Sequence, residues 1–272
     1  MEKIELIAMD MDGTLLTSHQ KILPYTKEVL MNLQKQGVSL VLASGRDIES
    51  LAFYGKQLEI EKYPQSGYIV LNGLEIYNSQ KECLYKGKRL NKDDVYILNA
   101  LAKKYMFDMV IFFEKCLYIL TYGKTGIMEN HFIDRDKYGI DDVKKIPEDL
   151  YQSVKKVAFI QSATVMDKVL PIIQLDMKSR FEICRVERDW VEVNPAMASK
   201  GKALMKLSTI KNIPLSHMIA FGNGENDIEM LKVAGKGVAM ENSFATVKSA
   251  GDDVCLDNEH DGIGVYLENL KV

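Results

Sequence analysis

The chain has 272 residues, of which 47% are hydrophobic and 27% are charged. This composition is typical of a soluble globular protein, and the length predicts one large or two smaller hydrophobic cores. A formal net charge of −3 provides no electrostatic attraction to nucleic acid or to an anionic membrane, so we expect neither as a partner.

The first predicted element is a buried strand over residues 4–9, and two carboxylates, Asp10 and Asp12, follow it directly. Like charges at the end of a buried strand are unfavourable unless something positive lies near them. A divalent cation, with a phosphate held by that cation, meets this need. Gly13 lets the backbone turn sharply, and Thr14 can hydrogen-bond within the turn. A polar turn alone explains one aspartate but not the whole pattern.

Helices and strands then alternate up to residue 82. The pattern of apolar residues predicts a helix over 25–36, a strand over 39–43, a helix over 47–58 and a strand over 68–71 that ends at Asn72-Gly73. Such alternation is typical of a doubly wound α/β fold with a parallel sheet.

The pattern changes between residues 83 and 194, where strands follow one another without intervening helices. The predicted elements are a helix over 93–105, strands over 107–113 and 117–122, a polar helical stretch, a strand over 154–161, a helix from Thr164, and strands over 180–186 and 190–193. Residues 187–189 are predicted to join the last two strands as a hairpin. Consecutive strands favour an antiparallel sheet, so this segment is interpreted as an α+β insert.

The alternating pattern returns from about residue 195. It predicts a helix from Lys202, a strand over 218–221, a helix over 226–234, a strand over 237–240, a helix over 243–250, a strand over 253–256 and a final helix. The chain therefore divides into a core made of residues 1–82 and 195–272 and an inserted domain over 83–194.

Four polar clusters follow strands or begin helices of the predicted core: residues 10–14, 44–46, 199–202 and 222–227. The carboxyl ends of parallel strands share one edge of a sheet, and ligands bind at that edge where the strand order reverses. We therefore expect the four clusters to meet at one site.

These residues, in this order, resemble the haloacid dehalogenase-like phosphohydrolases, and within them the Cof-type branch of sugar-phosphate and cofactor phosphatases. The resemblance rests on Asp10-Met11-Asp12-Gly13-Thr14, Asn72-Gly73, Lys200-Gly201, the run from Gly222 to Asp227, and residues 237–242. It implies a Rossmann-like core whose inserted α+β domain is a cap that closes over the site. It also implies a Mg²⁺-dependent phosphatase that acts on small phosphorylated metabolites.

The two aspartates of the first motif are given distinct roles by this resemblance. Asp10 is the expected nucleophile, which forms an aspartyl-phosphate that water then hydrolyses. Asp12 is the expected general acid and later general base, because alternate residues of a strand point the same way. The Asp10 carboxylate and the Asp12 backbone carbonyl are both expected to bind magnesium.

Lys200 is expected to supply a fixed positive charge near Asp10. Its alternative role, a surface lysine at a helix N-terminus, is unfavourable because the helix dipole repels cations there. Ser44 and the Gly45 N–H are expected to hydrogen-bond the transferred phosphoryl group, and Ser44 can at the same time cap the following helix. Arg46 either binds the phosphate or braces a carboxylate. The remaining predicted phosphate contacts are Met11 and Asn226.

Position 223 departs from the family pattern Gly-Asp-x-x-Asn-Asp, whose first aspartate is usually a direct magnesium ligand. Asn223 still offers a carbonyl oxygen, but it removes one negative charge, so magnesium should bind more weakly. Asp227 is expected to compensate, directly or through a water molecule. A polar turn that caps the helix beginning near Asp227 is the alternative explanation of this cluster.

Two other functions share part of this pattern. A phospho-accepting receiver module also combines an acidic pair with a hydroxyl and a lysine, but it is about half as long and has no α+β insert. A phosphate-ligand binding or weakly active regulatory protein of the same fold is conceivable because Asn223 weakens metal binding. Haloalkanoate dehalogenation and phosphomutase activity are less favoured, since Asp12 supplies the acid and base that phosphomonoester hydrolysis needs.

The location of the protein is indicated by its cysteines and its N-terminus. The thiols of Cys83, Cys116, Cys184 and Cys255 lie far apart in the sequence, which indicates reduced thiols rather than a disulfide framework or a zinc site. The N-terminal apolar run is too short for a signal peptide, and no apolar stretch reaches transmembrane length. We therefore expect a cytoplasmic protein, and the sequence indicates no particular oligomeric state.

Overall fold

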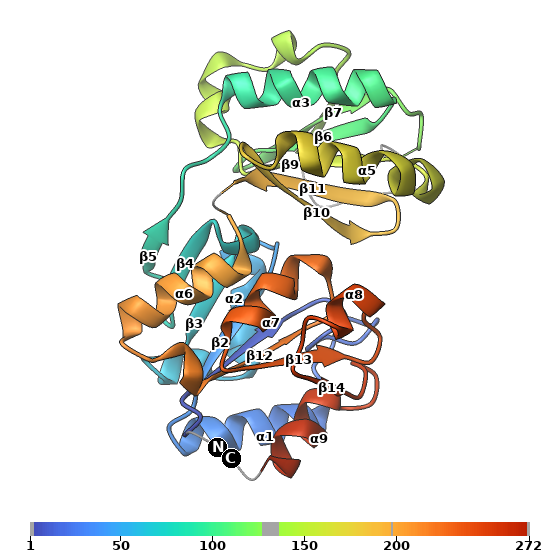
Figure 1. Cartoon of the computed structure of the whole chain (residues 1–272). Coiled ribbons are helices and arrows are strands. Elements are labelled where there is room, and N and C mark those ends of the chain that lie inside the picture. The colour runs from blue at the N-terminus through green and yellow to red at the C-terminus, as the bar shows by residue number, and fades with distance from the viewer. Residues whose placement is uncertain (1–2, 127–135, 197, 271–272) are drawn as a thin grey trace. The chain divides into compact units, whose positions relative to one another are not determined.

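A computed structural model of the chain describes residues 3–126, 136–196 and 198–270. The chain divides into two compact units, a core unit of residues 1–87 and 198–272 and an insert unit of residues 88–197 (Figure 1). The domain boundaries predicted after residues 82 and 194 lie a few residues too early. Strand β5 (Cys83–Lys86) pairs with β4 (Glu75–Asn78) in the core sheet, and β11 (Trp190–Pro195) still pairs with an insert strand at Pro195.

The core unit is built on an eight-stranded sheet with the strand order β14-β13-β12-β1-β2-β3-β4-β5. Neighbouring strands from β14 to β3 are parallel, whereas β4 and β5 are antiparallel. The parallel strands are β1 (Leu6–Asp10), β2 (Ser39–Ala43), β3 (Gly67–Val70), β12 (Met218–Gly222), β13 (Lys236–Met240) and β14 (Asp253–Cys255). Their apolar runs are continuous because both faces of the sheet are covered.

Helices cover the two faces of this sheet. One apolar cluster joins Ile7 and Met9 of β1 to the first, second and last helices, α1 (Pro24–Lys35), α2 (Ile48–Gln57) and α9 (Gly262–Asn269). A second cluster joins Leu6 and Ala8 to α6 (Lys200–Lys211), α7 (Ile228–Val233) and α8 (Ala245–Lys248). The predicted doubly wound α/β core is thereby confirmed.

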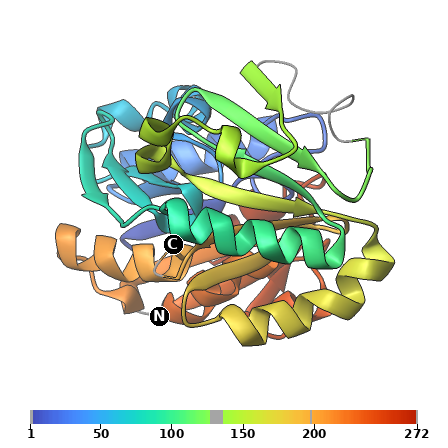
Figure 2. The same ribbon diagram turned by 90° about the horizontal axis from the view of Figure 1, so that it is seen from above.

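The insert unit is an α+β domain, as predicted. Its six-stranded sheet has the order β10-β11-β9-β6-β7-β8, and every neighbouring pair is antiparallel except β7 and β8. The strands not yet bounded are β6 (Asp108–Phe112), β7 (Cys116–Thr121), β8 (Asp136–Gly139), β9 (Lys156–Ile160) and β10 (Phe181–Glu187). Helices α3 (Lys92–Tyr105) and α5 (Ala163–Met177) share one apolar cluster with one face of this sheet (Figures 1 and 2).

The polar helical stretch predicted between the strands at 117–122 and 154–161 is described only in part. Its described part contains β8 and two 3₁₀ segments, Val143–Lys145 and Glu148–Ser153, rather than an α-helix. All four residues of β8 are exposed, so the alternation of apolar and polar residues that signals a strand is absent. Residues 127–135 of the predicted stretch lie outside the described residues. The hairpin is also shorter than expected, because Glu187 pairs directly with Trp190.

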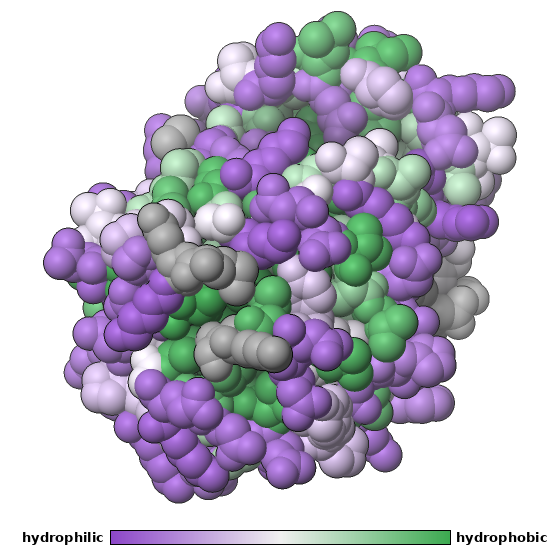
Figure 3. Space-filling view, turned by 60° about the horizontal axis from the view of Figure 1, so that its bottom comes forward, coloured by the Kyte–Doolittle hydropathy of each residue, from purple (hydrophilic) through white to green (hydrophobic). Residues whose placement is uncertain are grey.

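None of the helices in the described ranges combines the length and the apolarity that crossing a bilayer takes. The face of the molecule shown in Figure 3 carries mainly hydrophilic side chains, with apolar ones in scattered groups between them. Scattered apolar side chains are ordinary on protein surfaces and indicate no particular partner.

Candidate active site

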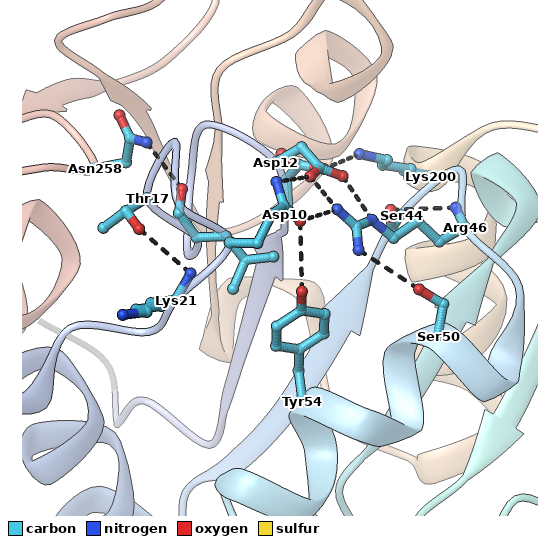
Figure 4. A network of polar contacts seen from close by, with 12 residues as sticks. Asp10, Asp12, Thr17, Lys21, Ser44, Arg46, Ser50, Tyr54, Lys200 and Asn258 are labelled. Atoms are coloured by element: carbon cyan, nitrogen blue, oxygen red, sulfur yellow. Dashed lines mark hydrogen bonds and ion pairs between the residues drawn. The ribbon is translucent and has the colours of Figure 1, made fainter. Parts of the chain in front are cut away.

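The four polar clusters come together at one edge of the core sheet. Strand β1 lies between β2 and β12, so the carboxyl ends of three parallel strands share this edge. The N-terminus of α6 reaches the same place, because Lys200 contacts both Asp10 at the end of β1 and Asp227 in the segment after β12. Figure 4 shows Lys200 and Arg46 approaching the two aspartates of the first motif from different elements.

Asp10, Lys200 and Asp227 form a buried group that we call the inner cluster. Lys200 Nζ donates hydrogen bonds to Asp10 Oδ1 at 2.5 Å and to Asp227 Oδ1 at 2.6 Å. Lys200 and Asp227 are fully buried, and Asp10 is 6% exposed. Helix α6 begins two residues earlier than predicted, because Ser199 caps it by accepting a hydrogen bond from the Lys202 N–H. The cap thereby places Lys200 in the first turn of the helix.

Burial dominates the electrostatics of the inner cluster. Burial, and after it the nearby Asp227 carboxylate, raise the pKa of Asp10 to about 7, although Lys200 opposes the shift. Burial also disfavours the charge of Lys200, but the two carboxylates outweigh it and hold the pKa of the ammonium well above its usual range. Lys200 is therefore a permanently charged group whose position is fixed by two acceptors.

Asp227 also organises the loop that follows β12. Its Oδ2 accepts hydrogen bonds from the backbone N–H groups of Asn223 at 3.0 Å and Gly224 at 2.9 Å. Both oxygens of this carboxylate are therefore bound to N–H donors, one to Lys200 and the other to the loop. This arrangement fixes the loop relative to Lys200.

Asp12, Arg46, Gln20 and Tyr54 form a group that we call the outer cluster, in which Asp12 and Gln20 are exposed, Arg46 is half-buried and Tyr54 is buried. Arg46 Nε donates to Asp12 Oδ2 at 2.8 Å, and Arg46 Nη2 donates to Asp12 Oδ1. Gln20 Nε2 donates to Asp12 Oδ1 at 3.1 Å, and Gln20 Oε1 accepts from both Arg46 Nη2 and the Tyr54 hydroxyl. The Arg46 guanidinium lies over the Tyr54 ring, 5.6 Å from its centroid (Figure 4).

The environment of Asp12 is opposite to that of Asp10. The Asp12 side chain is 50% exposed. Partial burial disfavours its charge, but the hydrogen bonds and the charge of Arg46 outweigh this and hold the pKa of Asp12 below its usual range. Asp12 is therefore held as a carboxylate between donors.

Two members of the outer cluster were missed by the sequence reasoning. Tyr54 follows Arg46 and Ser50 at intervals of four residues, so the predicted helix places all three on one face, and this spacing is a signal that could have found it. Gln20 lies in a turn with a φ of 58°. No motif or periodicity marks it, and only the folded turn brings its amide to Asp12.

The predicted phosphate contacts gather around the loop after β2. Ser44 is 3% exposed, and its Oγ accepts a hydrogen bond from the Arg46 N–H at 3.2 Å, next to Gly45. Asn72, which has a φ of 53°, donates its N–H to the Ser44 carbonyl and accepts at its side-chain oxygen from Asn226 Nδ2 at 2.9 Å. Asn72 therefore connects the loop after β2 with the loop after β12.

Met11 faces the core rather than the site. Its side chain is fully buried in the apolar cluster with α1 and α2, and its carbonyl accepts hydrogen bonds from the Thr14 and Leu16 N–H groups. Only the remaining backbone N–H of Met11 is a candidate for contact with a bound phosphate.

Asn223, the first residue after β12, points its side-chain amide at the loop that carries Asp10 and Asp12. The end of the amide at this position is surrounded by acceptors, so with no cation between them it is assigned as Nδ2. It lies 3.0 Å from the Asp12 carbonyl oxygen, 3.1 Å from Asp10 Oδ2 and 2.9 Å from Thr14 Oγ1. Gly13 makes room for it: its φ is 76°, and a Cβ there would come within 2.5 Å of the Asn223 amide.

The oxygens around this amide fit a hard divalent cation. Asp10 Oδ2, the Asp12 carbonyl and, with the amide turned, Asn223 Oδ1 are the kind of ligands that magnesium takes in proteins. In the ranges that the structure describes, no three His, Cys, Asp or Glu side chains are grouped so as to hold a metal ion. A cation at this place would therefore depend on one carboxylate together with carbonyl oxygens.

Comparisons with known proteins agree with this geometry. A family model described as haloacid dehalogenase-like hydrolase matches residues 7–267. The phosphatase YwpJ of Bacillus subtilis is 26% identical over 290 residues, covering 98% of this chain and 100% of the relative. The 5-amino-6-(5-phospho-D-ribitylamino)uracil phosphatase YcsE of the same organism is 27% identical over 270 residues, covering 98% and 95%. A solved haloacid dehalogenase-like hydrolase from Bacteroides thetaiotaomicron has a TM-score of 0.76 and 26% identity, covering 98% of this chain and 100% of that chain.

Proposed function

Because the chain belongs to the haloacid dehalogenase-like hydrolase family, we propose that it is a magnesium-dependent phosphatase that hydrolyses small phosphomonoesters through an aspartyl-phosphate. The inner cluster carries this proposal: a strand-end carboxylate is held by a fully buried lysine at the edge of a parallel sheet where ligands bind. The names of the two relatives from Bacillus subtilis support phosphatase activity.

The first step is attack of the Asp10 carboxylate on phosphorus, which breaks the bond to the leaving oxygen and forms an acyl phosphate. Lys200 favours the ionised Asp10 against the effect of burial and offers charge to the transferred group. Asp10, Asp12 and Asn223 would hold magnesium, which when bound neutralises phosphate oxygens and favours the carboxylate form of Asp10.

Asp12 first takes up a proton from solvent, gives it to the leaving oxygen, and as the carboxylate then takes one from the water that hydrolyses the acyl phosphate. Its ion pair with Arg46 suits the second role, because the guanidinium favours the carboxylate. A phosphate dianion competes with Asp12 for the same guanidinium. We therefore infer that substrate binding draws Arg46 toward the phosphate and loosens its hold on Asp12.

The remaining residues position the transferred group. Ser44, the Gly45 N–H and the Met11 N–H donate to it, and Asn226 is held toward it by Asn72. Asp227 was expected to bind magnesium. Because both of its oxygens are bound to N–H donors, we propose instead that it orients Lys200, so that Asn223 is left as the third metal ligand.

The proposed substrates are small phosphorylated metabolites, sugar phosphates or phosphorylated cofactors, and the proposed location is the cytoplasm. The relative YcsE is named for a phosphorylated ribityl compound, which supports a substrate of this size. The proposal involves neither nucleic acid nor a membrane.

The direct experiment is an assay of phosphate release by the purified full chain. The substrates are p-nitrophenyl phosphate, a panel of sugar phosphates, pyridoxal phosphate and flavin mononucleotide, each with magnesium and with EDTA. We expect turnover with magnesium, loss in EDTA and no turnover by Asp10→Asn. The alternative, a phosphate-ligand binding or weakly active regulatory protein, is favoured by Asn223, and it predicts binding of a panel member without release of phosphate.

A further inference from the structure

We propose that the side-chain amide of Asn223 joins the Asp10 carboxylate to the Asp12 carbonyl through its N–H groups, and that magnesium binds only after this amide turns its oxygen inward. Because it concerns the metal ligands of the proposed reaction, this inference rests on the proposed function. It predicts a protein whose active-site loops are stable without a divalent cation and whose affinity for that cation is lowered by the cost of turning the amide.

The contacts of the amide support this proposal. Asn223 Nδ2 lies within 3.1 Å of both Asp10 Oδ2 and the Asp12 carbonyl oxygen, the two oxygens expected to bind magnesium. An amide NH₂ has two hydrogens and can donate to both. The two N–H groups give a donor to each of two neighbouring oxygens that would otherwise face each other without one. They do so without adding a charge.

The charges around the site explain why an amide is favourable there. Asp10 and Asp227 already share a single buried cation, Lys200. An aspartate at position 223 would place a third carboxylate within about 3 Å of Asp10 Oδ2, and like charges at that distance oppose ionisation strongly unless a cation separates them. The amide removes this requirement for a cation.

Thr14 allows both orientations of the amide. Its hydroxyl lies 2.9 Å from the inward end of the Asn223 amide. A threonine hydroxyl both donates and accepts, so it donates to Oδ1 in one orientation, and in the other it shares one of the two N–H groups of Nδ2 with Asp10 or Asp12. Turning the amide therefore keeps the contact with Thr14 and exchanges only the contacts with Asp10 and Asp12 for contacts with a cation. Two orientations that share one partner can interconvert at modest cost, and the cation selects between them.

The experiment is thermal unfolding of the full chain in EDTA and over a magnesium titration, for the parent, Asn223→Asp and Asn258→Asp. The Asn258 amide donates to the Leu16 carbonyl at 2.8 Å, so Asn258→Asp removes an amide donor and adds the same charge away from the Asp10 carboxylate. No turnover is involved, so failure of the proposed phosphatase activity leaves this measurement unaffected.

In EDTA, we expect Asn223→Asp to melt at least about 4 °C below the parent. Magnesium should raise the melting temperature of both proteins. The concentration that gives half of the maximal rise should be at least about tenfold lower for Asn223→Asp than for the parent. Magnesium should raise the melting temperature of Asn258→Asp by no more than it raises that of the parent. The proposal is overturned if Asn223→Asp is as stable as the parent in EDTA, or if the two respond to the same magnesium concentrations.

A second measurement follows the amide itself and remains informative if Asn223→Asp folds poorly. In ¹H–¹⁵N spectra of the parent, the side-chain NH₂ pair of Asn223 is identified by its loss in Asn223→Ser. We expect magnesium to shift this pair, because its N–H groups exchange the Asp10 and Asp12 acceptors for others. A pair that stays unchanged at saturating magnesium contradicts the proposed turn of the amide.

Discussion

The inner and outer clusters contain the two aspartates of one short motif and each pairs a carboxylate with a cation, yet they differ in exposure and in the direction of the pKa shift. Asp10 is 6% exposed and shares a fully buried lysine with Asp227. The Asp12 side chain is 50% exposed and pairs with Arg46 at the surface. Burial raises the pKa of Asp10, whereas Arg46 outweighs partial burial and lowers the pKa of Asp12.

This difference shows how one turn can supply two carboxylates for separate tasks. The inner cluster is rigid because each charge is buried and removal of one partner leaves the others uncompensated. The outer cluster is exchangeable because its ion pair is partly exposed to solvent, and pairs exposed to solvent contribute little to stability. A nucleophile benefits from the first environment, and a group that must give and take a proton benefits from the second.

The largest expected effect comes from breaking the inner cluster with Lys200→Met. The substitution leaves two buried carboxylates without their cation, and we expect a loss of about 3–5 kcal/mol in the free energy of unfolding. Urea denaturation measures it. Lys206→Met, at an exposed position of the same helix, is the control and should change little. Equal stability of the two variants would contradict the account of the inner cluster.

Asp10→Asn tests the same cluster through pH. The pKa of Asp10 is about 7 in the folded chain against an ordinary value of 3.8, so the folded state binds more protons than the unfolded state between these values. Stability contributed by the protonated Asp10 is therefore present at low pH and is lost as the pH rises toward 7. We expect the free energy of unfolding of Asp10→Asn, relative to the parent in EDTA, to increase from about pH 5 to about pH 8. If the difference in the free energy of unfolding between Asp10→Asn and the parent does not change with pH, the pKa of Asp10 is not raised in the folded chain.

The outer cluster is tested by measuring Asp12→Asn on two substrates, one with a poor leaving group and one with a good leaving group. General acid assistance matters for a sugar phosphate, whose alkoxide is a poor leaving group, and little for p-nitrophenyl phosphate. We expect kcat for the sugar phosphate to fall by about 10²-fold or more, with a clearly smaller loss in the first turnover of p-nitrophenyl phosphate. Rapid-quench kinetics with both substrates measures this, and equal losses would count against the acid role.

The smallest expected effect comes from Gln20→Leu. This exposed side chain donates to Asp12 and accepts from Arg46 and the Tyr54 hydroxyl, and the loss of these contacts should change the stability by less than about 1 kcal/mol. We expect kcat on a sugar phosphate to fall by about twofold to tenfold, because Asp12 is less well oriented. Gln36→Leu, at another exposed glutamine, serves as the control. An unchanged kcat would show that Arg46 alone positions Asp12.

The sequence was sufficient to predict the core fold and the meeting of the candidate site residues, because these residues directly follow buried apolar strands. Asp10, Ser44 and Asn223 each come at or just after the end of a parallel strand, and such strand ends necessarily meet at one edge. Strand β8 was missed because it is exposed and has no apolar alternation. Its pairing depends on the neighbouring strand rather than on its own residues.

The contacts of the site could be predicted less well than its position. Gln20 reaches Asp12 only through a turn with a positive φ, which no pattern in the sequence announces. Asn223 was recognised as a departure from the family pattern, but the orientation of its amide depends on the acceptors around it, which only the folded loops define. The expectation that Asp227 binds magnesium rests on the motif, whereas its hydrogen bonds to the loop after β12 exist only in the folded chain.

The central claim is that Asp10 becomes phosphorylated during turnover. The most direct measurement is an acid quench of Asp12→Asn during reaction with p-nitrophenyl phosphate and magnesium, followed by peptide mapping. This variant is chosen because loss of the general base slows hydrolysis of the acyl phosphate and lets it accumulate. The account predicts a hydroxylamine-sensitive phosphate on Asp10 and none in the variant that also carries Asp10→Asn. Phosphate on another residue, or steady turnover with no phosphorylated protein at any time point, would contradict it.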